Sequence, residues 1–559
     1  MKHLLYTIII ISLIAPTLAA QTDQPQWSAV MAGETLCDPV LHGEYLYTLS
    51  SDHALNCINH TGSFVWRRNI ERTTKPVLSI SNSGILVVAD STGMLQAVSS
   101  QGIYLWSLKL SEPVLYPPYC TADGRICALT QSNLYCLSIK GKIKWKIDLS
   151  ASPAGQVCET GAASLLLTLT NHEFLTVSLT GELLSTYSLK KEITALAAAP
   201  GGYIMATGDG TLTYYRSGIN AGQTGQQSAG AQTSTGFAAW QTYEAAPLFM
   251  KTISEELICV YADGSVSARD VQTNTIRWSA KLNTHIALPL YCIKTDGEYY
   301  LSCKGYAAII SSTGTVTREK NLSASAFLPL ITPNGILIAM EDWVINSWQF
   351  DTKILKETPR GQNAAELQYR ILKMQAQSQS LPFFVPNGDT QALLTHIATA
   401  IDEGTVGTQE AAYAFTLHTI LANAQKAVYF PYYFTVYERA QAAELLGKLE
   451  SLEYRGLLLD EAQKTDDPTL AVAIIRALGF VGADPDGKSI EHIQLLLRRC
   501  GIREQEPAAA ACESLGEIAK YGDKTAADAA IKALFSIAAG AYTENIRQYA
   551  RQKIKTIVE

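Results

Sequence analysis

A short turn recurs along residues 21–355 at a nearly constant interval. In each copy a glycine precedes a tryptophan by four residues, as in Gly141–Trp145, and strands of alternating apolar residues flank the turn. Asn274 replaces the glycine of one copy, and asparagine also tolerates the positive φ of such turns. The tryptophan position itself changes to Ser185 and Arg318 in two copies.

The tryptophan position recurs every 38 to 40 residues, with one gap of 55. Strands that repeat at this period are typical of a β-propeller. Four strands per unit and eight units predict an all-β eight-bladed propeller over residues 21–358, with seven blades as the alternative. Trp27 begins a strand without an earlier partner, so residues 26–31 are expected to pair with strands at 320–350 and close the ring. The segment 353–356 competes for that place.

The gap of 55 residues coincides with a segment of unusual composition. Residues 217–236 contain no charged side chain and one sizeable apolar residue. Such a segment cannot bury enough apolar surface to order itself. We therefore expect a flexible excursion between the last two strands of the fifth blade.

The repeats resemble the PQQ-like (quinoprotein) propeller superfamily, whose blades end in Ala-x-Asp-x-x-Thr-Gly-x-x-x-Trp. One copy nearly reproduces this motif, from Ala268 through Asp270 and Thr273 to Trp278. The other copies are one residue shorter, which is similar to the non-enzymatic branch that includes the propeller lipoprotein of outer-membrane protein assembly. The resemblance implies that the tryptophans pack between blades as structural residues. The blade-motif residues are Trp27, Trp66, Trp106, Trp145, Trp240, Trp278, Gly62, Gly102 and Gly141.

The apolar period changes from two to 3.6 residues after Pro359. Residues 363–379 and 390–403 are amphipathic, and residues 437–559 read as paired helices. Asp467-Pro468 supplies an N-cap and a proline at the first helical position. The motif Ile475-Arg-Ala-Leu-Gly479 recurs 37 residues later as Cys512-Glu-Ser-Leu-Gly516, a spacing typical of HEAT-like repeats. We predict a helical linker region over 359–436 and an all-α HEAT-like domain over 437–559.

The N-terminus reads as a secretory signal peptide over residues 1–20. Lys2 and His3 precede an apolar run that ends near the small residues Ala19 and Ala20. No later stretch approaches the roughly 20 apolar residues of a membrane-spanning helix. We expect an exported, soluble protein in the periplasm or outside the cell. The net charge of −7 shows no basic excess in either half, which argues against a nucleic-acid partner.

The eleven cysteines do not read as a disulfide framework, because their number is odd and no Cys-x-x-Cys occurs. Cys57 and Cys136 occupy the same repeat position, which Ala97 and Thr176 fill in other copies. A position shared by cysteine, alanine and threonine is a small buried strand position. Most of these cysteines are therefore expected to be unpaired thiols.

One loop matches the phosphate-binding Walker A pattern letter for letter, Gly482-Ala-Asp-Pro-Asp-Gly-Lys-Ser489. A helix precedes it instead of a strand, Pro485 lacks an N–H, and Asp484 and Asp486 would repel phosphates. We read the loop as an inter-helix turn and expect no nucleotide. A calcium loop fails as well, because Ile493 stands where a glutamate ligand is needed.

Two stretches of the helical half are rich in aromatic residues, 382–386 and 429–437. Such density indicates either a partner-binding hot spot or packing between helices or against the propeller. The two domains are joined by a short connector, so we expect them to pack together, with residues 467–559 left free to bind. Residues expected at or near this junction are Phe383, Phe384, Tyr432 and Phe434.

The sequence contains no motif of a catalytic or metal-binding site: no His-x-x-x-His pair, no Gly-x-Ser-x-Gly and no adjacent cysteine pair of the kind found in catalytic quinoproteins. We therefore predict a non-catalytic protein-binding scaffold without cofactor, with a role in cell-envelope or outer-membrane protein assembly implied by the resemblance. A quinone-dependent oxidoreductase is the alternative.

Overall fold

The structure is a computed structural model that describes residues 25–558 with several gaps. The gaps are 161–163, 189–190, 201, 217–237, 244, 296, 323–326, 333–334, 351–389, 423–433 and 502–503. The helix expected at 363–379 and the signal peptide lie outside the described residues.

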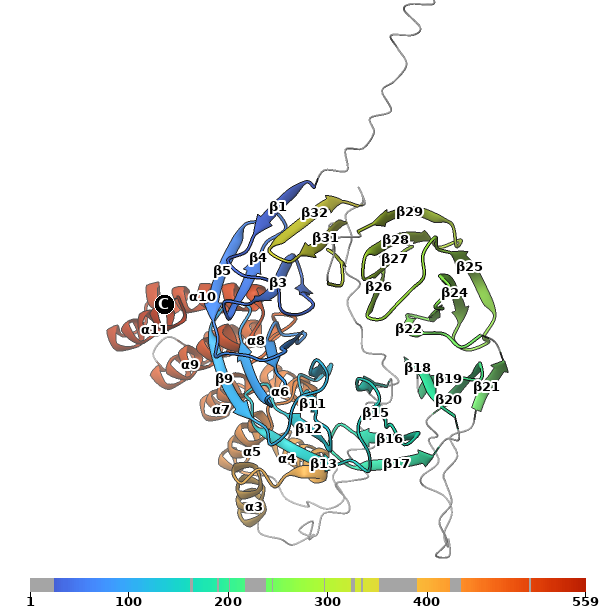
Figure 1. Cartoon of the computed structure of the whole chain (residues 1–559). Coiled ribbons are helices and arrows are strands. Elements are labelled where there is room, and N and C mark those ends of the chain that lie inside the picture. The colour runs from blue at the N-terminus through green and yellow to red at the C-terminus, as the bar shows by residue number, and fades with distance from the viewer. Residues whose placement is uncertain are drawn as a thin grey trace, which may run out of the picture.

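Eight four-stranded antiparallel sheets form a closed ring, as the sequence period predicts (Figure 1). Blades 1 and 2 are β2 (Val40–His42), β3 (Tyr45–Ser50), β4 (Ala54–Ile58), β5 (Phe64–Asn69) and β6 (Val77–Ile80), β7 (Leu86–Ala89), β8 (Met94–Val98), β9 (Tyr104–Lys109). Blades 3 and 4 are β10 (Tyr119–Cys120), β11 (Ile126–Leu129), β12 (Asn133–Leu137), β13 (Ile143–Asp148) and β14 (Cys158–Glu159), β15 (Ser164–Thr168), β16 (Glu173–Ser178), β17 (Leu183–Ser188).

The remaining blades follow the same plan, with the four strands in chain order from the centre outwards except in blade 8. Blades 5 and 6 are β18 (Ile193–Ala199), β19 (Gly202–Thr207), β20 (Thr211–Arg216), β21 (Ala238–Tyr243) and β22 (Phe249–Ile253), β23 (Glu256–Val260), β24 (Ser265–Asp270), β25 (Ile276–Lys281). Blades 7 and 8 are β26 (Leu290–Thr295), β27 (Glu298–Cys303), β28 (Tyr306–Ser311), β29 (Val316–Asn321) and β30 (Leu330–Ile331), β31 (Ile336–Glu341), β32 (Val344–Gln349), β1 (Trp27–Val30).

The ring is closed by its first strand. β1 pairs antiparallel with β32, with Trp27 opposite Ser347 and Val30 opposite Val344. The predicted closure by residues 26–31 is therefore confirmed. The competing segment 353–356 lies outside the described residues, as does the uncharged segment 217–236. That segment connects β20 and β21, which pair side by side as the last two strands of blade 5, at the predicted position.

The recurring glycine and tryptophan form the contact between successive blades. A Cβ built on Gly141 would lie 2.5 Å from Cδ2 of Trp106, the tryptophan of the preceding blade. The indole Nε1 of Trp106 donates to the carbonyl of Ile139, two residues before that glycine, at 2.8 Å. Only glycine fits there, because the site is crowded and the φ of Gly141 is +80°.

The same arrangement recurs around the first half of the ring. Trp27 covers Gly62, Trp66 covers Gly102 and Trp145 covers Gly181, and each indole donates to the carbonyl two residues before its glycine.

Blade 4 has Ser185 at the tryptophan position, and its contact with blade 5 carries aromatic rings instead. Phe174 stacks on Tyr187 at a centroid distance of 4.7 Å and meets Tyr203 of blade 5 edge-on at 6.0 Å. The aromatic rings supply the apolar contact area between these two blades.

The C-terminal half is all-α, as predicted. Its elements are α3 (Thr390–Asp402), η1 (Gly407–Gln409), α4 (Glu410–Leu421), α5 (Val436–Lys448), α6 (Leu452–Lys464), α7 (Pro468–Val481), α8 (Lys488–Cys500), α9 (Gln505–Tyr521), α10 (Lys524–Ala539) and α11 (Glu544–Val558). Asp467 caps α7 by accepting hydrogen bonds from the amides of Thr469 and Leu470, and Pro468 takes the first helical position.

The helices stack in two layers around one apolar core. α5, α7, α9 and α11 pack in succession in one layer, and α6, α8 and α10 form the other. Two glycines permit a close approach within the first layer. A Cβ on Gly447 of α5 would lie 2.5 Å from the backbone of Ala477, and one on Gly479 of α7 would lie 2.5 Å from Oγ of Ser514. Among the described residues, no helix is long and apolar enough to cross a membrane.

Candidate functional site at the propeller–helix junction

The helical domain lies against one side of the ring, beside β5, β9 and β13 (Figure 1). The two domains thus pack together, as the short connector predicts. Loops 449–452, 482–487 and 521–523, each joining a helix of one layer to the next helix of the other layer, approach blades 1 to 3.

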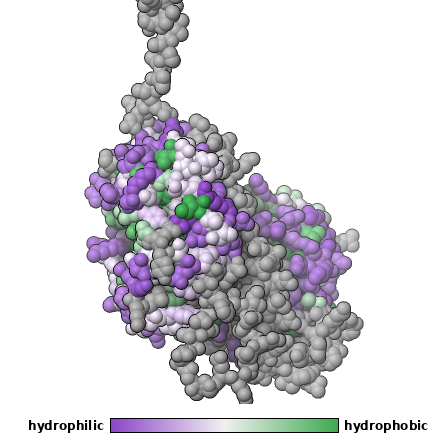
Figure 2. All heavy atoms as spheres, turned by 90° about the vertical axis from the view of Figure 1, so that its right-hand side faces the viewer, coloured by the Kyte–Doolittle hydropathy of each residue, from purple (hydrophilic) through white to green (hydrophobic). Residues whose placement is uncertain are grey.

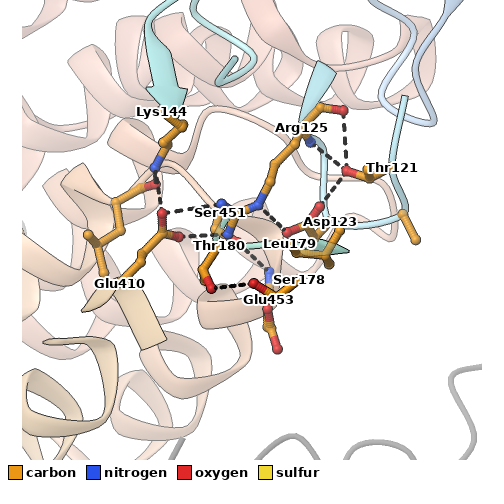
Figure 3. A network of polar contacts seen from close by, with 12 residues as sticks. Thr121, Asp123, Arg125, Lys144, Ser178, Leu179, Thr180, Glu410, Ser451 and Glu453 are labelled. Atoms are coloured by element: carbon orange, nitrogen blue, oxygen red, sulfur yellow. Dashed lines mark hydrogen bonds and ion pairs between the residues drawn. The ribbon is translucent and has the colours of Figure 1, made fainter. Parts of the chain in front are cut away.

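A buried network of charges lies at the blade 3 end of this junction (Figure 3). Arg125, in the connection between β10 and β11, has a side chain that is 2% exposed. Its Nε donates to Asp123 Oδ2 at 2.7 Å, and its two terminal nitrogens donate to the two oxygens of Glu410 at 2.7 and 3.2 Å. Glu410 begins α4, so one guanidinium bridges the propeller and the helical domain in the bidentate geometry that is strongest for this pair.

Lys144 and two backbone groups complete the network. Lys144 of β13 lies 3.4 Å from the second oxygen of Glu410 and donates to the carbonyl of Leu449. The amide of Leu452, the first residue of α6, donates to the carbonyl of Asp123 at 3.2 Å. Arg125, Asp123 and Glu410 are therefore buried beside the half-buried Lys144, and each cation is paired with a carboxylate, which is the condition under which buried charge is tolerated.

The network keeps its groups ionised. Burial would raise the pKa of Glu410, but Arg125 and Lys144 outweigh it and lower the pKa below its ordinary value of 4.5. Burial would lower the pKa of Arg125, but the carboxylates of Glu410 and Asp123 outweigh burial and raise this pKa well above its ordinary value. Glu410 and Arg125 consequently stay charged at neutral pH.

A second set of contacts fixes the far end of the helical stack to blades 1 and 2. Lys524, at the start of α10, donates to the hydroxyl of Tyr45 at 2.8 Å and lies 4.7 Å from the centre of that ring. The hydroxyl of Ser100 contacts the carbonyl of Gly522 at 3.5 Å. Gly84 leaves room for the backbone of Asp523, because a Cβ there would lie 3.1 Å from the Cα of Asp523.

An apolar and aromatic contact lies between the two polar ones. Ala483 and Tyr521 are buried in one cluster with Ile85 and Ile139 of the propeller. The ammonium of Lys140 lies 5.4 Å from the centre of the Tyr521 ring. Residues 482–487 and 521–524 thus face the propeller, and the prediction that residues 467–559 are free of it is wrong for these loops.

The Walker-like loop has an internal role in this arrangement. The carboxylate of Asp484 accepts hydrogen bonds from the amides of Ser489 and Ile490, at 2.9 and 3.0 Å. Arg455 of α6 binds Asp484 and Asp486 at 2.7 Å each. The amides that would hold a phosphate at the start of α8 are therefore occupied by a side chain of the loop itself.

The predicted aromatic residues fall only partly within the described residues. Phe383, Phe384 and Tyr432 lie outside them, so their place at the junction stays a prediction. Phe434, which precedes α5, is 6% exposed and belongs to the core of the helical domain. The described junction instead combines charged and small residues with an apolar contact around Tyr521. One signal for its charged part was visible in the sequence, since Lys140, Lys142 and Lys144 alternate in a single copy of the repeat.

The face of the ring opposite the contacts with the helical domain, called the far face below, carries exposed apolar side chains. In an antiparallel blade, the first and third connections lie at one end of the strands and the second connection and the link to the next blade lie at the other. The helical contacts lie at first and third connections. Trp343 lies in a second connection, Val30 at the end of a fourth strand, and Leu115 and Leu288 in links between blades, so all four lie on the far face.

Other parts of the described surface give weaker indications of a functional site. An open groove of about 530 Å³ on the outer edge of blades 1 and 2 is lined by Arg67, Arg68, Asn69 and Tyr104. The described residues contain no group of three or more histidine, cysteine, aspartate or glutamate side chains placed to hold a metal. The outer surface of blades 6 and 7 is mostly hydrophilic with small scattered apolar patches (Figure 2).

Known proteins resemble this chain at the level of sequence family and of fold. An uncharacterized protein of Treponema pallidum (strain Nichols) is 26% identical over 435 residues, which cover 68% of this chain and 81% of the relative. The crystal structure of BamB from Moraxella catarrhalis aligns with a TM-score of 0.45 and 16% identity, over 59% of this chain and 98% of BamB. Sqt1 of Saccharomyces cerevisiae aligns with a TM-score of 0.45 and 12% identity, over 58% of this chain and 98% of Sqt1.

A family model covers the first part of the propeller. Residues 14–186 match the model described as outer membrane protein assembly factor BamB. The matched region ends within β17, in blade 4. The match confirms that these blades are built from the PQQ-like propeller repeat that their recurring turns indicate.

Proposed function

We propose that this protein is a non-catalytic scaffold that binds another protein through the far face of its propeller. The observation that supports this proposal is the exposure of large apolar side chains on that face, where Trp343 is 45% exposed beside Val30, which is 67% exposed. Aromatic side chains of this kind supply much of the energy of protein interfaces. Trp343 and Val30 are neighbours, because Val30 lies opposite Val344 and the amide of Met31 donates to the carbonyl of Trp343 at 2.8 Å, so the two side chains form one small apolar patch.

The junction gives the scaffold a fixed shape. The helical domain is attached at the charge network, at the Tyr521 cluster and at Tyr45, three places spread over three blades. Attachment at three points resists both tilting and rotation. A partner on the far face and a second partner on the helical repeats would therefore be held at a constant distance and orientation to each other.

The cellular setting is proposed from the family match. The model that matches residues 14–186 is described as an outer membrane protein assembly factor. Together with the signal-like N-terminus, this supports an exported protein that acts in the cell envelope, in the assembly of outer-membrane or other envelope proteins.

Site-specific photo-crosslinking tests the proposed binding face. A photoreactive amino acid replaces Trp343 on the far face or, as the matched control, Phe64, which is 44% exposed on β5 at the outer edge of the ring. Irradiation of intact envelopes should yield a discrete crosslinked protein from position 343 and none from position 64. The change Trp343→Ala should abolish co-purification of that protein, whereas Phe64→Ala should leave it. Equal crosslinking from both positions, or from neither, would contradict the assignment.

A further inference from the structure

Two of the eleven cysteines face each other across neighbouring strands of blade 3. Cys127 of β11 lies directly opposite Cys136 of β12, and the two residues are 1% and 0% exposed. The neighbouring thiol of Cys136, together with burial, raises the pKa of the Cys127 thiol well above its ordinary value. In the strand registers, none of the other cysteines lies opposite a cysteine.

The register places this pair at a position suited to a covalent bond. The amide of Thr130 donates to the carbonyl of Asn133 at 2.9 Å and closes the hairpin between the two strands. Hydrogen-bonded and non-hydrogen-bonded pairs alternate from that point, so Cys127 and Cys136, three steps away, form a non-hydrogen-bonded pair. The Cα atoms of such pairs are about 4.5 Å apart. This spacing falls within the range that a disulfide bond spans, about 4.4 to 6.8 Å.

The other blades fill the same pair of positions differently. In blades 1, 2 and 4 a larger side chain lies opposite a smaller one, whereas blades 5 and 7 have large side chains at both positions, Ile204 with Tyr214 and Tyr300 with Ile309. The pairs of blades 1, 2 and 4 are Tyr47 with Cys57, Val87 with Ala97, and Leu166 with Thr176. Blade 3 alone among these six has a cysteine on both strands.

We propose that Cys127 and Cys136 form a disulfide bond when the chain folds in the presence of a disulfide oxidant. The thiolate of one cysteine attacks the oxidant disulfide and releases one oxidant thiol. The second cysteine thiolate then displaces the other oxidant thiol, so that two protein thiols are oxidised and one oxidant disulfide is reduced to two thiols. The bond closes during folding, before the neighbouring blades bury both sulfur atoms, and the folded ring then shields it from reductants.

Mass spectrometry of a single tryptic peptide tests this proposal. Arg125 and Lys140 bound the peptide Ile126–Lys140, which contains these two cysteines and no other. The full chain is unfolded, refolded with oxidised and reduced glutathione, and alkylated under denaturing conditions. We expect two of the eleven thiols to resist alkylation, and this peptide to be lighter by two hydrogen atoms until it is reduced. Full alkylation of the peptide after oxidative refolding would overturn the proposal.

Two alanine variants serve as matched controls. Cys136→Ala should restore alkylation of Cys127 and is compatible with folding, because Ala97 occupies the same buried position in blade 2. Cys259, on the second strand of blade 6, is equally buried but lies opposite Ser267, so Cys259→Ala should leave the loss of two thiols unchanged. If the chain does not refold, the alkylation and mass spectrometry of this peptide are carried out on protein secreted into a bacterial periplasm. A fully alkylated peptide from that protein would contradict the proposed disulfide bond.

Discussion

The change Glu410→Gln should loosen the helical domain from the propeller without unfolding either. Glutamine keeps the shape of the side chain and one carbonyl acceptor but removes the charge that faces Arg125 and Lys144. Arg125 would then keep one carboxylate partner, Asp123, and Lys144 would keep the carbonyl of Leu449. Removal of one partner from a buried ion pair typically costs about 3 to 5 kcal/mol. Because glutamine still accepts one hydrogen bond, we expect about 3 kcal/mol, which corresponds to an increase of about 100-fold in the undocked population.

The amide of Leu452 reports this equilibrium directly. Its hydrogen bond to the carbonyl of Asp123 joins the two domains, so its exchange with solvent requires undocking. Hydrogen exchange of the peptide around Leu452 should accelerate by about 100-fold in Glu410→Gln, while exchange of the buried strand β7 should not change. The control Glu444→Gln removes a half-exposed carboxylate that binds Arg476, and should alter stability by less than about 1 kcal/mol. Unchanged exchange at Leu452 in a folded Glu410→Gln protein would refute the role assigned to the network.

Acid should have the same effect as the substitution. The pKa of Glu410 is lower in the folded protein than in the unfolded chain, because Arg125 and Lys144 outweigh its burial. A group of this kind contributes stability above its unfolded pKa, and that stability is lost as the pH falls through the folded pKa. The protection factor of the Leu452 amide, which corrects for the slower intrinsic exchange in acid, should therefore fall below pH 4.5, the ordinary value for a glutamate, and this pH dependence should be weaker in Glu410→Gln.

Three further expectations concern the ring itself. Gly141→Ala should lower the free energy of unfolding by about 3 kcal/mol in chemical denaturation, because the new Cβ would meet a tryptophan ring at a backbone φ of +80°. The control Gly297→Ala has the same φ but open space around the Cβ, so it should lower the free energy of unfolding by about 1 kcal/mol. Replacement of residues 217–236 by a short Gly-Ser turn should leave the melting temperature unchanged, because loop closure entropy varies slowly with length, and a large loss would show that the segment packs. Deletion of residues 21–32 removes β1 from blade 8 and should lower the melting temperature markedly.

The ring could be predicted from the sequence because each blade repeats the same physical solution. A turn glycine, a tryptophan that covers it and strands of alternating apolar residues recur at one period, so each copy supports the interpretation of the others. The exceptions also have a structural explanation. Ser185 occurs in the blade whose contact with the next blade is made by stacked aromatic rings instead of a tryptophan. Asn274, read as a substitute for glycine, has a φ of +59°.

The residues of the junction could not be identified from the sequence, because all but the alternating lysines lack a local signature. Glu410 looks like an ordinary acidic residue in the first turn of a helix, and its partner Arg125 lies 285 residues earlier in the chain. Alternating lysines on an outer strand look like a solvated face. Aromatic density suggested that Phe434 lies at or near the junction or in a partner-binding site, whereas the structure buries it among the helices.

What distinguishes blade 3 is its departure from the repeat. The residue after the first turn glycine is Ile85 in blade 2 and Arg125 in blade 3, and the residue before the tryptophan is Leu105 in blade 2 and Lys144 in blade 3. The positions that depart from the repeat, Arg125 and Lys144, supply the charge network, whereas repeat positions such as Ile85 contact the helical domain through apolar packing. Glu410 is the carboxylate that faces both Arg125 and Lys144, and the carbonyl of Leu449 accepts from Lys144, so docking of the helical domain on another blade would leave Arg125 with Asp123 alone and Lys144 without these two partners. The charge network thus selects one docking position on a ring whose blades are otherwise alike.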